Sequence, residues 1–297
     1  MKLVLSGGNG FIGRQISAVW RRSGHEVVVL ARSPGLGQAA WDGRTIGAWT
    51  AELEGADLLL NLAGRSVNCR YNDHNKEVIR RSRVESTRVL AEAVGSCARP
   101  PRAWFNSSTA TIYRHAQDRP MDDETGEIGR GFSVEVAKAW EAEFFKGECP
   151  SRRLALRTAM VMGPGDDGAF AAYSSLAKRG LGGRMGDGEQ MVSWIHIEDF
   201  ARAVEFLLAT DASGTINVSA PGPLSNEEFM SEISRALGKK VALPTPKWLL
   251  EVGAFFLRTE TELPLKSRWV LPSRLQSLGF EFRFPEWKSA VADLLQQ

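Results

Sequence analysis

A glycine-rich turn near the amino terminus constrains the fold more than any other feature of this chain. Residues 2–6, KLVLS, have the apolar character of a short strand, and residues 16–24, ISAVWRRSG, have the pattern of an amphipathic helix. The sequence GGNGFIGR lies between them, and residues 25–32, HEVVVLAR, supply a second apolar strand. A strand, a glycine-rich turn, a helix and another strand predict a βαβ unit that binds a dinucleotide. The alternative interpretation is an ordinary glycine-rich turn.

Each of three glycines has a physical role in this turn. Gly7 allows the tight turn, Gly10 lets the backbone approach a pyrophosphate, and Gly13 lets the helix pack closely on the strand. The amino terminus of the helix then presents unpaired N–H groups and a partial positive charge to the phosphates. We therefore expect cofactor contacts from the turn and the first residues of the helix, namely Gly7, Asn9, Gly10, Phe11, Ile12 and Gly13.

The end of the second strand distinguishes a site for NAD from a site for NADP. A site for NAD places Asp or Glu there, where the carboxylate bonds the 2′-hydroxyl of the adenosine ribose. This chain has Ala31, Arg32 and Ser33 instead. A guanidinium matches a 2′-phosphate in charge and in the geometry of its donors. The sequence therefore favours NADP over NAD, with these three residues in the site.

Residues 56–64, ADLLLNLAG, have the continuous apolar character of a buried parallel strand. Ligands of such sheets bind beyond the carboxyl ends of the strands. We therefore expect Leu62, Ala63 and Gly64 to lie over the cofactor, where small residues leave room for the adenine and ribose.

Composition excludes several classes of protein. The chain has 297 residues, of which 43% are hydrophobic and 24% charged, with a formal net charge of +2, so it is not expected to bind nucleic acid. No apolar run reaches the roughly 18–20 residues of a membrane span, and MKLVLSGG is not expected to be a signal peptide. The three cysteines and four histidines have no spacing typical of disulfides or metal sites. We expect a cytoplasmic protein without a metal, and the sequence leaves a homo-oligomer open.

Several motifs together resemble the extended short-chain dehydrogenases/reductases. The resemblance begins with GGNGFIG and NLAG and continues through STRVL (86–90), NSSTATIY (106–113), LALRTAMVMGPG (154–165) and SWIHIEDFARAVEFLL (193–208). It covers nearly the whole chain. The family implies an α/β fold with a Rossmann-type, doubly wound parallel sheet. We expect an NADP-binding domain at residues 1–163, with its sheet completed by parts of 190–222, and a smaller α/β substrate region at 164–297.

Two further stretches, GGRMGDGEQMVSWIHIEDFARA and VLPSRLQSLGFEFRFPEW, resemble the atypical epimerase-like subgroup called family 39U. That resemblance implies additional cofactor contacts at Glu77, Arg83 and Val161. In the substrate region, residues 226–238 predict an amphipathic helix capped by Ser225. Residues 246–258 predict a second helix, whose apolar face indicates core packing or, as an alternative, contact with a membrane surface.

The chemistry of the family implies a Ser or Thr together with a YxxxK pair on one helix. Thr109 falls at the hydroxyl position, although it could also serve only to satisfy the end of a strand. None of the three tyrosines has a lysine four residues later, and Val134 stands four residues before Lys138. The family commonly places an acid four residues after the lysine, and counting back from Glu141 gives Ala137. Lys138 is therefore either the anchor of the nicotinamide ribose or a surface lysine.

Other residues could replace the missing acid, although none forms an acid/base pair that the sequence identifies. The candidates are Glu77, Arg83, Glu135, Asp166, His196 and Asp199, although the apolar run around His196 favours a hydrogen-bonded core histidine. Two functions stay open. One is an NADP-dependent oxidoreductase or epimerase with Thr109 and Lys138 as catalytic residues and a small polar, sugar-linked substrate. The other is a catalytically silent NADP(H)-binding sensor or scaffold, which explains the missing tyrosine.

Overall fold

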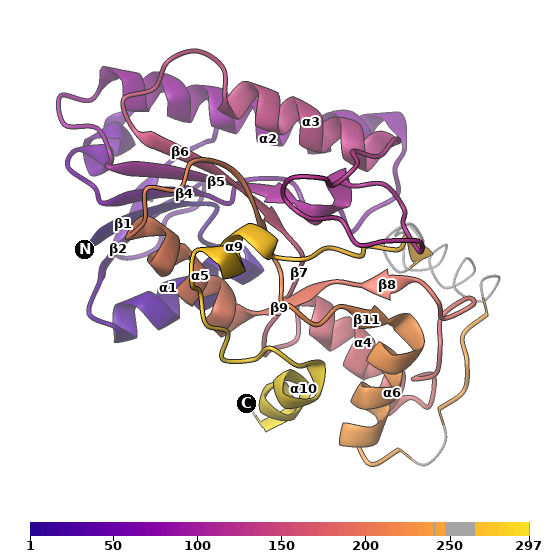
Figure 1. Ribbon diagram of the computed structural model, residues 1–297. Helices are drawn as coiled ribbons and strands as arrows, with labels where there is room; N and C mark the ends of the chain where they lie inside the picture. Colours follow the sequence, from indigo (N-terminus) through magenta and orange to yellow (C-terminus); the bar gives the residue numbers. More distant parts are fainter. Residues whose placement is uncertain (240–241, 247–264, 297) are drawn as a thin grey trace.

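A seven-stranded parallel sheet forms the centre of the protein, which we describe from a computed structural model (Figure 1). The structure describes residues 1–239, 242–246 and 265–296. Every neighbouring pair in this sheet is parallel. In sheet order the strands are β10 (Gly214–Val218), β6 (Arg152–Thr158), β5 (Ala103–Thr109), β4 (Leu58–Asn61), β1 (Lys2–Ser6), β2 (Glu26–Ala31) and β3 (Gln38–Ala40).

This strand order confirms the expected Rossmann-type fold. The chain runs from β1 outward through β2 to β3, and then returns to place β4 on the other side of β1. The reversal creates a topological switch point between β1 and β4, where ligands of doubly wound sheets bind. The glycine-rich turn leaves the sheet at the end of β1, directly at this point.

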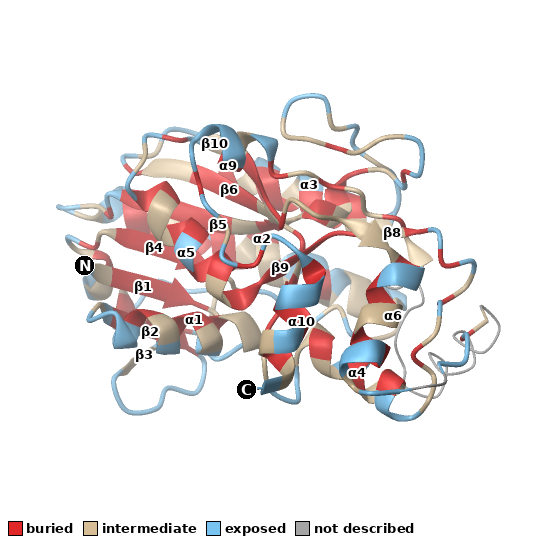
Figure 2. Ribbon diagram, turned by 60° about the horizontal axis from the view of Figure 1, so that its bottom comes forward, coloured by how far each residue is buried: buried red, intermediate tan, exposed pale blue. Residues whose placement is uncertain are grey.

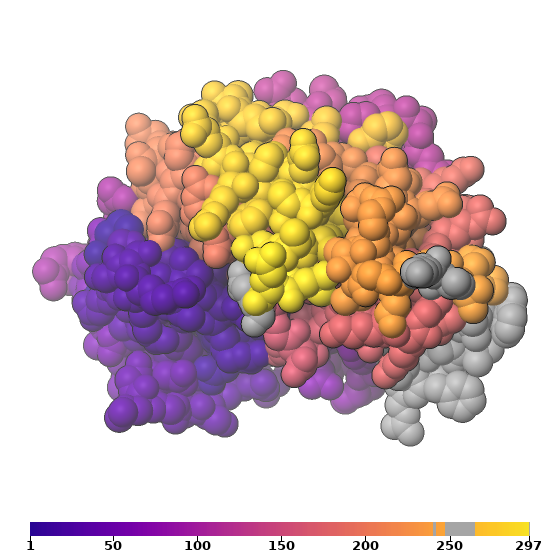
Figure 3. Space-filling model, turned by 90° about the horizontal axis from the view of Figure 1, so that it is seen from below, coloured from indigo at the N-terminus to yellow at the C-terminus, as the bar shows by residue number. Residues whose placement is uncertain are grey.

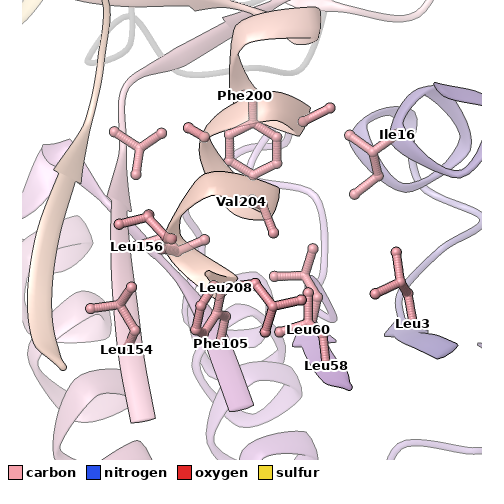
Figure 4. Packing of buried hydrophobic residues seen from close by; sticks show 14 of the residues in the cluster. Leu3, Ile16, Leu58, Leu60, Phe105, Leu154, Leu156, Phe200, Val204 and Leu208 are labelled. Atoms are coloured by element: carbon pink, nitrogen blue, oxygen red, sulfur yellow. The ribbon is translucent and has the colours of Figure 1, made fainter. Parts of the chain in front are cut away.

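Helices cover both faces of the sheet because its strands are apolar on both sides. Leu3 and Leu5 pack with α1 (Phe11–Arg22) and α5 (Ile197–Leu208) on one face (Figure 4). Val4, between them in sequence, packs on the other face, in the cluster that holds residues of α2 (Asp73–Ser96). Figure 2 shows the central strands β1, β4 and β5 as largely buried. The helix α3 (Phe132–Phe144) lies beside α2. Two short 3₁₀ helices complete this unit, η1 (Ala48–Leu53) and η2 (Ala110–Ile112).

A smaller unit lies below the carboxyl ends of the strands in Figure 1. Its core joins α4 (Ala169–Lys178), α6 (Asn226–Ala236) and α10 (Trp287–Gln296) through contacts between aromatic rings, with Phe229 and Trp287 stacked at 4.3 Å between centroids. Figure 3 views the molecule from below and shows the residues near the carboxyl terminus, in yellow, in the middle of the view. The other elements of this unit are the parallel pair β7 (Met160–Met162) and β9 (Trp194–His196), and the antiparallel pair β8 (Met191–Val192) and β11 (Leu224–Ser225). The helix α9 (Ser273–Ser277) instead packs against β10, with Leu275 in the core of the large sheet.

The predicted cap of α6 is confirmed. The Ser225 hydroxyl accepts a hydrogen bond from the backbone N–H of Glu228 at 3.2 Å, and the Glu228 carboxylate accepts one in return from the Ser225 N–H at 3.0 Å. The second expected helix, from residue 246 to 258, lies outside the described residues apart from its first one. Within the described ranges, no helix has both the length and the apolarity that crossing a bilayer requires.

Candidate functional site

A cavity of about 520 Å³ lies at the carboxyl ends of the central strands. Its walls come from the glycine-rich turn, the loop after β4, the end of β5, the first turns of α3 and the start of α4. Eleven of the residues predicted from the sequence line it: Gly7, Gly10, Phe11, Ile12, Gly13, Leu62, Ala63, Gly64, Arg83, Thr109 and Val161. The fold therefore gathers segments far apart in sequence around one space.

The backbone of the glycine-rich turn has the geometry of a phosphate cradle. Gly7 has φ +76°, and a Cβ there would lie 2.8 Å from the backbone nitrogen of Ala63. A Cβ on Gly13 would lie 2.4 Å from the Cα of Gly8, so only glycine allows the helix this close to the strand. Gly10 differs, because a Cβ there would meet only the carbonyl of Gly7, at 3.3 Å. The space beside Gly10 is thus open to a ligand, and the turn fits a dinucleotide.

Buried polar groups hold the strand ends under this cavity. The amide of Asn61 donates to the side-chain oxygen of Asn106 at 2.6 Å, and its carbonyl accepts from the hydroxyl of Ser6 at 2.6 Å. The hydroxyl of Thr87 in α2 accepts from the amide of Asn61 at 3.2 Å and from the indole of Trp140 at 2.9 Å. These bonds fix β1, β4 and β5 relative to α2 and α3. They explain why the asparagines of NLAG and NSST and the threonine of STRVL occur together.

The end of β2 lies beside the glycine-rich turn. Ser6 pairs with Leu30, so Gly7 and Ala31 leave neighbouring strands at the same edge of the sheet. Ala31 is buried, whereas Arg32 and Ser33 are exposed. These three residues do not line the cavity itself. An exposed guanidinium at this edge suits a 2′-phosphate.

Asn9 and Gln38 connect the glycine-rich turn to the segment that follows β2. The Gln38 amide donates to the Asn9 carbonyl oxygen at 3.0 Å, and Gln38 also accepts from the backbone N–H of Gly35 at 3.0 Å. Asn9 is exposed and lies outside the cavity lining.

Glu77, another residue expected to contact the cofactor, is also exposed. Its carboxylate accepts a hydrogen bond from Arg80 at 3.0 Å on the surface of α2.

The face that α3 presents to the cavity favours the second of the two alternatives for Lys138, a surface lysine. Ser133, Val136 and Trp140 line the cavity, and Ala137 is completely buried behind them. Lys138 is exposed, and its Nζ lies 3.1 Å from a carboxylate oxygen of Glu135. A step of one residue rotates a side chain by about 100° around a helix, which turns Lys138 away from the cavity. Counted back from Glu141, the positions of a YxxxK pair hold Ser133, which lines the cavity, and the buried Ala137.

Thr109 ends β5 and lines the cavity, where its hydroxyl accepts from the backbone N–H of Thr111 at 3.1 Å. The adjacent Ser108 donates its hydroxyl proton to Glu141 at 2.6 Å. Arg157 donates to both carboxylate oxygens of Glu141, at 2.9 and 2.8 Å. Burial alone would lower the pKa of Arg157, but the Glu141 carboxylate outweighs it and raises this pKa above its usual value. Ser108 thus lines the cavity with its hydroxyl proton engaged by the Glu141 carboxylate.

Tyr113 has a structural position. Its phenol donates to the side-chain oxygen of Asn217 at 2.8 Å and accepts from Arg157 at 3.1 Å. The side chain is buried, and burial raises the pKa of its phenol. Tyr113 therefore connects β10 to β6 and does not line the cavity.

Four further candidate acids and bases, His196, Asp199, Glu135 and Asp166, lie outside the cavity lining. His196 is fully buried, accepts from the Glu198 N–H at 3.2 Å, and so caps α5. Asp199 is also fully buried and accepts from the backbone N–H groups of Arg283 and Phe284, at 2.8 Å each. Glu135 pairs with Lys138, and Asp166 is exposed. The adjacent Asp167, rather than Asp166, lines the cavity, paired with Arg14.

Sequence reasoning predicted Arg83 of α2 as a site residue but missed Tyr71, which the loop after β4 contributes to the cavity. Tyr71 lines the cavity, with its ring edge-on to Phe132 at 4.9 Å between centroids. Arg83 lies 5.1 Å from the Trp140 ring and donates to the carbonyls of Arg65 and Ile79, at 3.0 and 3.1 Å. Burial lowers the pKa of Arg83 to about 10, which leaves it charged at neutral pH. No local pattern marks Tyr71, because a loop has no periodicity.

Comparison with known proteins assigns the family. The model of the NAD dependent epimerase/dehydratase family matches residues 3–219, and that of a domain of unknown function matches residues 245–294. Epimerase family protein SDR39U1 of Homo sapiens is 29% identical over 99% of this chain and 100% of its own length. The protein of the same name from Mus musculus is 30% identical with the same coverage.

Solved structures agree with this assignment. The crystal structure of the human protein SDR39U1 with NADPH has a TM-score of 0.90 at 29% identity and covers 100% of both chains. A nucleoside-diphosphate sugar epimerase from Corynebacterium glutamicum has a TM-score of 0.79 at 29% identity, covering 99% of this chain and 57% of that one. Since the sequence matches and the fold agree, this chain belongs to the NAD dependent epimerase/dehydratase family, among the epimerase family proteins of the SDR39U1 type.

Proposed function

We propose that the protein binds NADP(H) at the carboxyl edge of its sheet and uses it as an oxidoreductase or epimerase on a small polar, sugar-linked substrate. One observation carries this proposal. A single cavity contacts both the phosphate cradle at Gly7, Gly10 and Gly13 and the hydroxyl groups of Ser108 and Thr109 at the end of β5. A site with this arrangement can hold a dinucleotide and a second molecule next to each other.

Each part of the cofactor would be held by a different set of residues. The turn and the start of α1 would bind its pyrophosphate, Arg32 and Ser33 its 2′-phosphate, and Leu62 to Gly64 its adenosine. NADPH supplies a hydride when bound. The human relative that was crystallised with NADPH supports this choice of dinucleotide.

The residues of this chain would orient the substrate at the other end of the cavity. Because the hydroxyl of Ser108 donates its hydrogen bond to Glu141, its oxygen would accept a hydrogen bond from a substrate hydroxyl. The hydroxyl of Thr109 donates to a substrate oxygen in this proposal. Trp140, Val136 and Ala159 form an apolar wall that excludes water from the reacting atoms.

A second candidate function rests on a different observation. In the register set by Glu141, the positions of the YxxxK pair hold Ser133, which lines the cavity, and Ala137, which is buried outside the lining. Neither residue can perform the proton transfer of a tyrosine or the anchoring of a lysine. This replacement favours a catalytically silent NADP(H)-binding sensor or scaffold.

Titration calorimetry with NADPH and NADH tests the binding proposal, and Gly10→Val serves as the variant with a blocked cradle. We expect tight binding of NADPH, weaker binding of NADH, and no binding to the variant. Equal, unsaturable heats for both cofactors would refute the proposal. Incubation with NADPH and a series of carbonyl compounds, followed by the absorbance of the reduced nicotinamide, then separates an oxidoreductase from a silent binding protein.

A further inference from the structure

We propose that Tyr71, from the loop between β4 and α2, is the catalytic acid that replaces the missing tyrosine of α3. This inference rests on the proposed NADP(H)-dependent oxidoreductase function and names the residue that would deliver the proton. It requires a phenol in the same cavity as the cofactor cradle, close to the first turn of α3, and beside a cation. The structure has all three features.

The position of the Tyr71 ring meets the first two requirements. The ring lines the cavity and packs edge-on against Phe132, with 4.9 Å between centroids and an interplanar angle of 66°. Phe132 immediately precedes Ser133, which stands where the YxxxK tyrosine would project. The two helices α2 and α3 lie side by side (Figure 1), so the loop that enters α2 reaches the amino-terminal end of α3. Tyr71 thus places a phenol from a different element beside the first turn of α3.

The other side chains of the cavity do not offer an equivalent proton donor. Among the described residues that line it, the ionisable side chains are Arg65, Tyr71, Arg83 and Asp167. Asp167 pairs with Arg14 next to the glycine-rich turn, at the end of the cavity that suits a pyrophosphate. The arginines stay charged at neutral pH and are poor proton donors. Tyr113 and Tyr173 lie outside this lining, with their hydroxyls turned to Asn217 and the sulfur of Met160.

Arg83 meets the third requirement. Its guanidinium lines the same wall and interacts electrostatically with the phenol of Tyr71. Two backbone carbonyls and the face of Trp140 hold the guanidinium in place. A fixed positive charge stabilises a phenolate, which is the effect that the lysine of a YxxxK pair has on its tyrosine. Tyr71 and Arg83 would therefore perform, from the loop before α2 and from α2 itself, the roles that the tyrosine and lysine of a YxxxK pair perform from one helix.

The proposed step is the reduction of a carbonyl. Tyr71 gives its phenolic proton to the carbonyl oxygen as the carbonyl carbon accepts the hydride of NADPH. The C=O double bond becomes a C–H and an O–H bond, the two electrons come from NADPH, and NADP⁺ is formed. The tyrosinate left behind is stabilised by Arg83 and regains its proton from water. The hydroxyl of Thr109 would hold the carbonyl oxygen during the transfer.

A first experiment tests the position of Tyr71 without relying on turnover. The protein is treated with tetranitromethane, and nitration of each tyrosine is measured by mass spectrometry with and without NADP⁺. We expect nitration at Tyr71 and little at the buried Tyr113, with NADP⁺ reducing the nitration of Tyr71 at least about fivefold. Nitration of Tyr71 that NADP⁺ leaves unchanged, or no nitration there, would overturn the inference.

A second experiment tests the chemistry with 9,10-phenanthrenequinone as the carbonyl probe and NADPH oxidation as the readout. We expect Tyr71→Phe to lower kcat at least about 100-fold with unchanged NADPH affinity, in the range that general acid catalysis contributes. Tyr173→Phe, which removes a phenol outside the cavity lining, should retain activity. The double variant Tyr71→Phe/Ser133→Tyr should recover part of the lost rate, because it returns a phenol to α3.

The outcomes separate this inference from the proposed function. If calorimetry shows no NADPH binding, the proposed function fails. If NADPH binds but the unmodified protein does not reduce the quinone, or if Tyr71→Phe reduces it at the original rate, the inference about Tyr71 fails while cofactor binding stands.

Discussion

Lys138 and Glu135 form an ion pair of 3.1 Å on the exposed side of α3, while Ala137, the residue before Lys138, is completely buried. This arrangement shows which side of the helix faces the cavity. It also separates the one lysine near the expected YxxxK position from the place where a nicotinamide ribose would lie.

Lys138→Ala should therefore leave NADPH binding unchanged. The only loss expected is the ion pair, in which the Lys138 and Glu135 side chains are 51% and 62% exposed, and such surface pairs contribute about 0.2–1 kcal/mol. Calorimetry of the variant and the original protein measures the affinity, and thermal unfolding checks the fold. A clear loss of affinity would restore Lys138 as a cofactor contact.

Arg32→Asp should weaken NADPH binding at least about tenfold and leave NADH binding nearly the same. The change removes a charge-assisted hydrogen bond of about 1.5–3 kcal/mol and adds repulsion against the 2′-phosphate. Arg22→Asp, at the far end of α1, is the matched control for a change of net charge. Calorimetry with both dinucleotides decides, and an equal loss for NADH and NADPH would argue against a 2′-phosphate contact.

Gly10→Val should affect cofactor binding, whereas Gly13→Val should affect the stability of the fold. Gly10→Val should abolish cofactor binding while the fold survives, because the added side chain enters the open space beside the turn. Gly13→Val should destabilise the fold itself, since the new Cβ would lie 2.4 Å from the Cα of Gly8. Fluorescence titration reports binding and circular dichroism reports unfolding. Retained binding in the Gly10 variant would remove this residue from the site.

Glu141→Gln should destabilise the protein by about 3–5 kcal/mol, because it leaves the charge of Arg157 buried without its carboxylate. The two side chains are only 11% and 13% exposed. Glu143→Gln is the control, because its partner Arg88 is 53% exposed and a surface pair contributes little. Chemical denaturation compares the two variants. Equal, small effects would show that the buried pair contributes little.

Acidification should destabilise the protein through His196. Burial is the main cause that lowers the pKa of His196, although the nearby Asp293 acts in the opposite direction. The unfolded chain then binds more protons than the folded one below the ordinary histidine pKa of about 6.5. This contribution to stability is complete above that pH and is lost as the pH falls toward the lower pKa of the folded state.

The slope that one such group contributes is at most about 1.4 kcal/mol per pH unit. Protonation of His196 would also remove the acceptor that caps α5 at Glu198. His196→Asn keeps an acceptor without the titration, so its stability should depend less on pH between 5 and 7, a range set by the histidine pKa of about 6.5. His74→Asn, at an exposed position of α2, should behave like the original protein. An unchanged slope in the His196 variant would exclude this residue as the cause.

Local sequence patterns determined the parts of the protein that depend on neighbouring residues alone. The glycine spacing predicts the turn between β1 and α1, because backbone conformation and close approach are local constraints at Gly7 and Gly13. The apolar run at 56–64 predicts a buried parallel strand, and the carboxyl ends of such strands meet at one edge of the sheet. The cap of α6 at Ser225 follows from the same kind of short-range rule.

Only the tertiary structure decided which side chains meet in the cavity. The packing of α3 beside α2 and β5 sets the rotation of the helix, and this rotation presents Ser133 and Val136 to the cavity and turns Lys138 to solvent. Tyr71 reaches the site from an irregular loop, where no period in the sequence fixes the direction of a side chain. The sequence alone established that a YxxxK pair is absent. The alternative phenol depends on contacts between residues 71 and 132, which only the folded chain brings together.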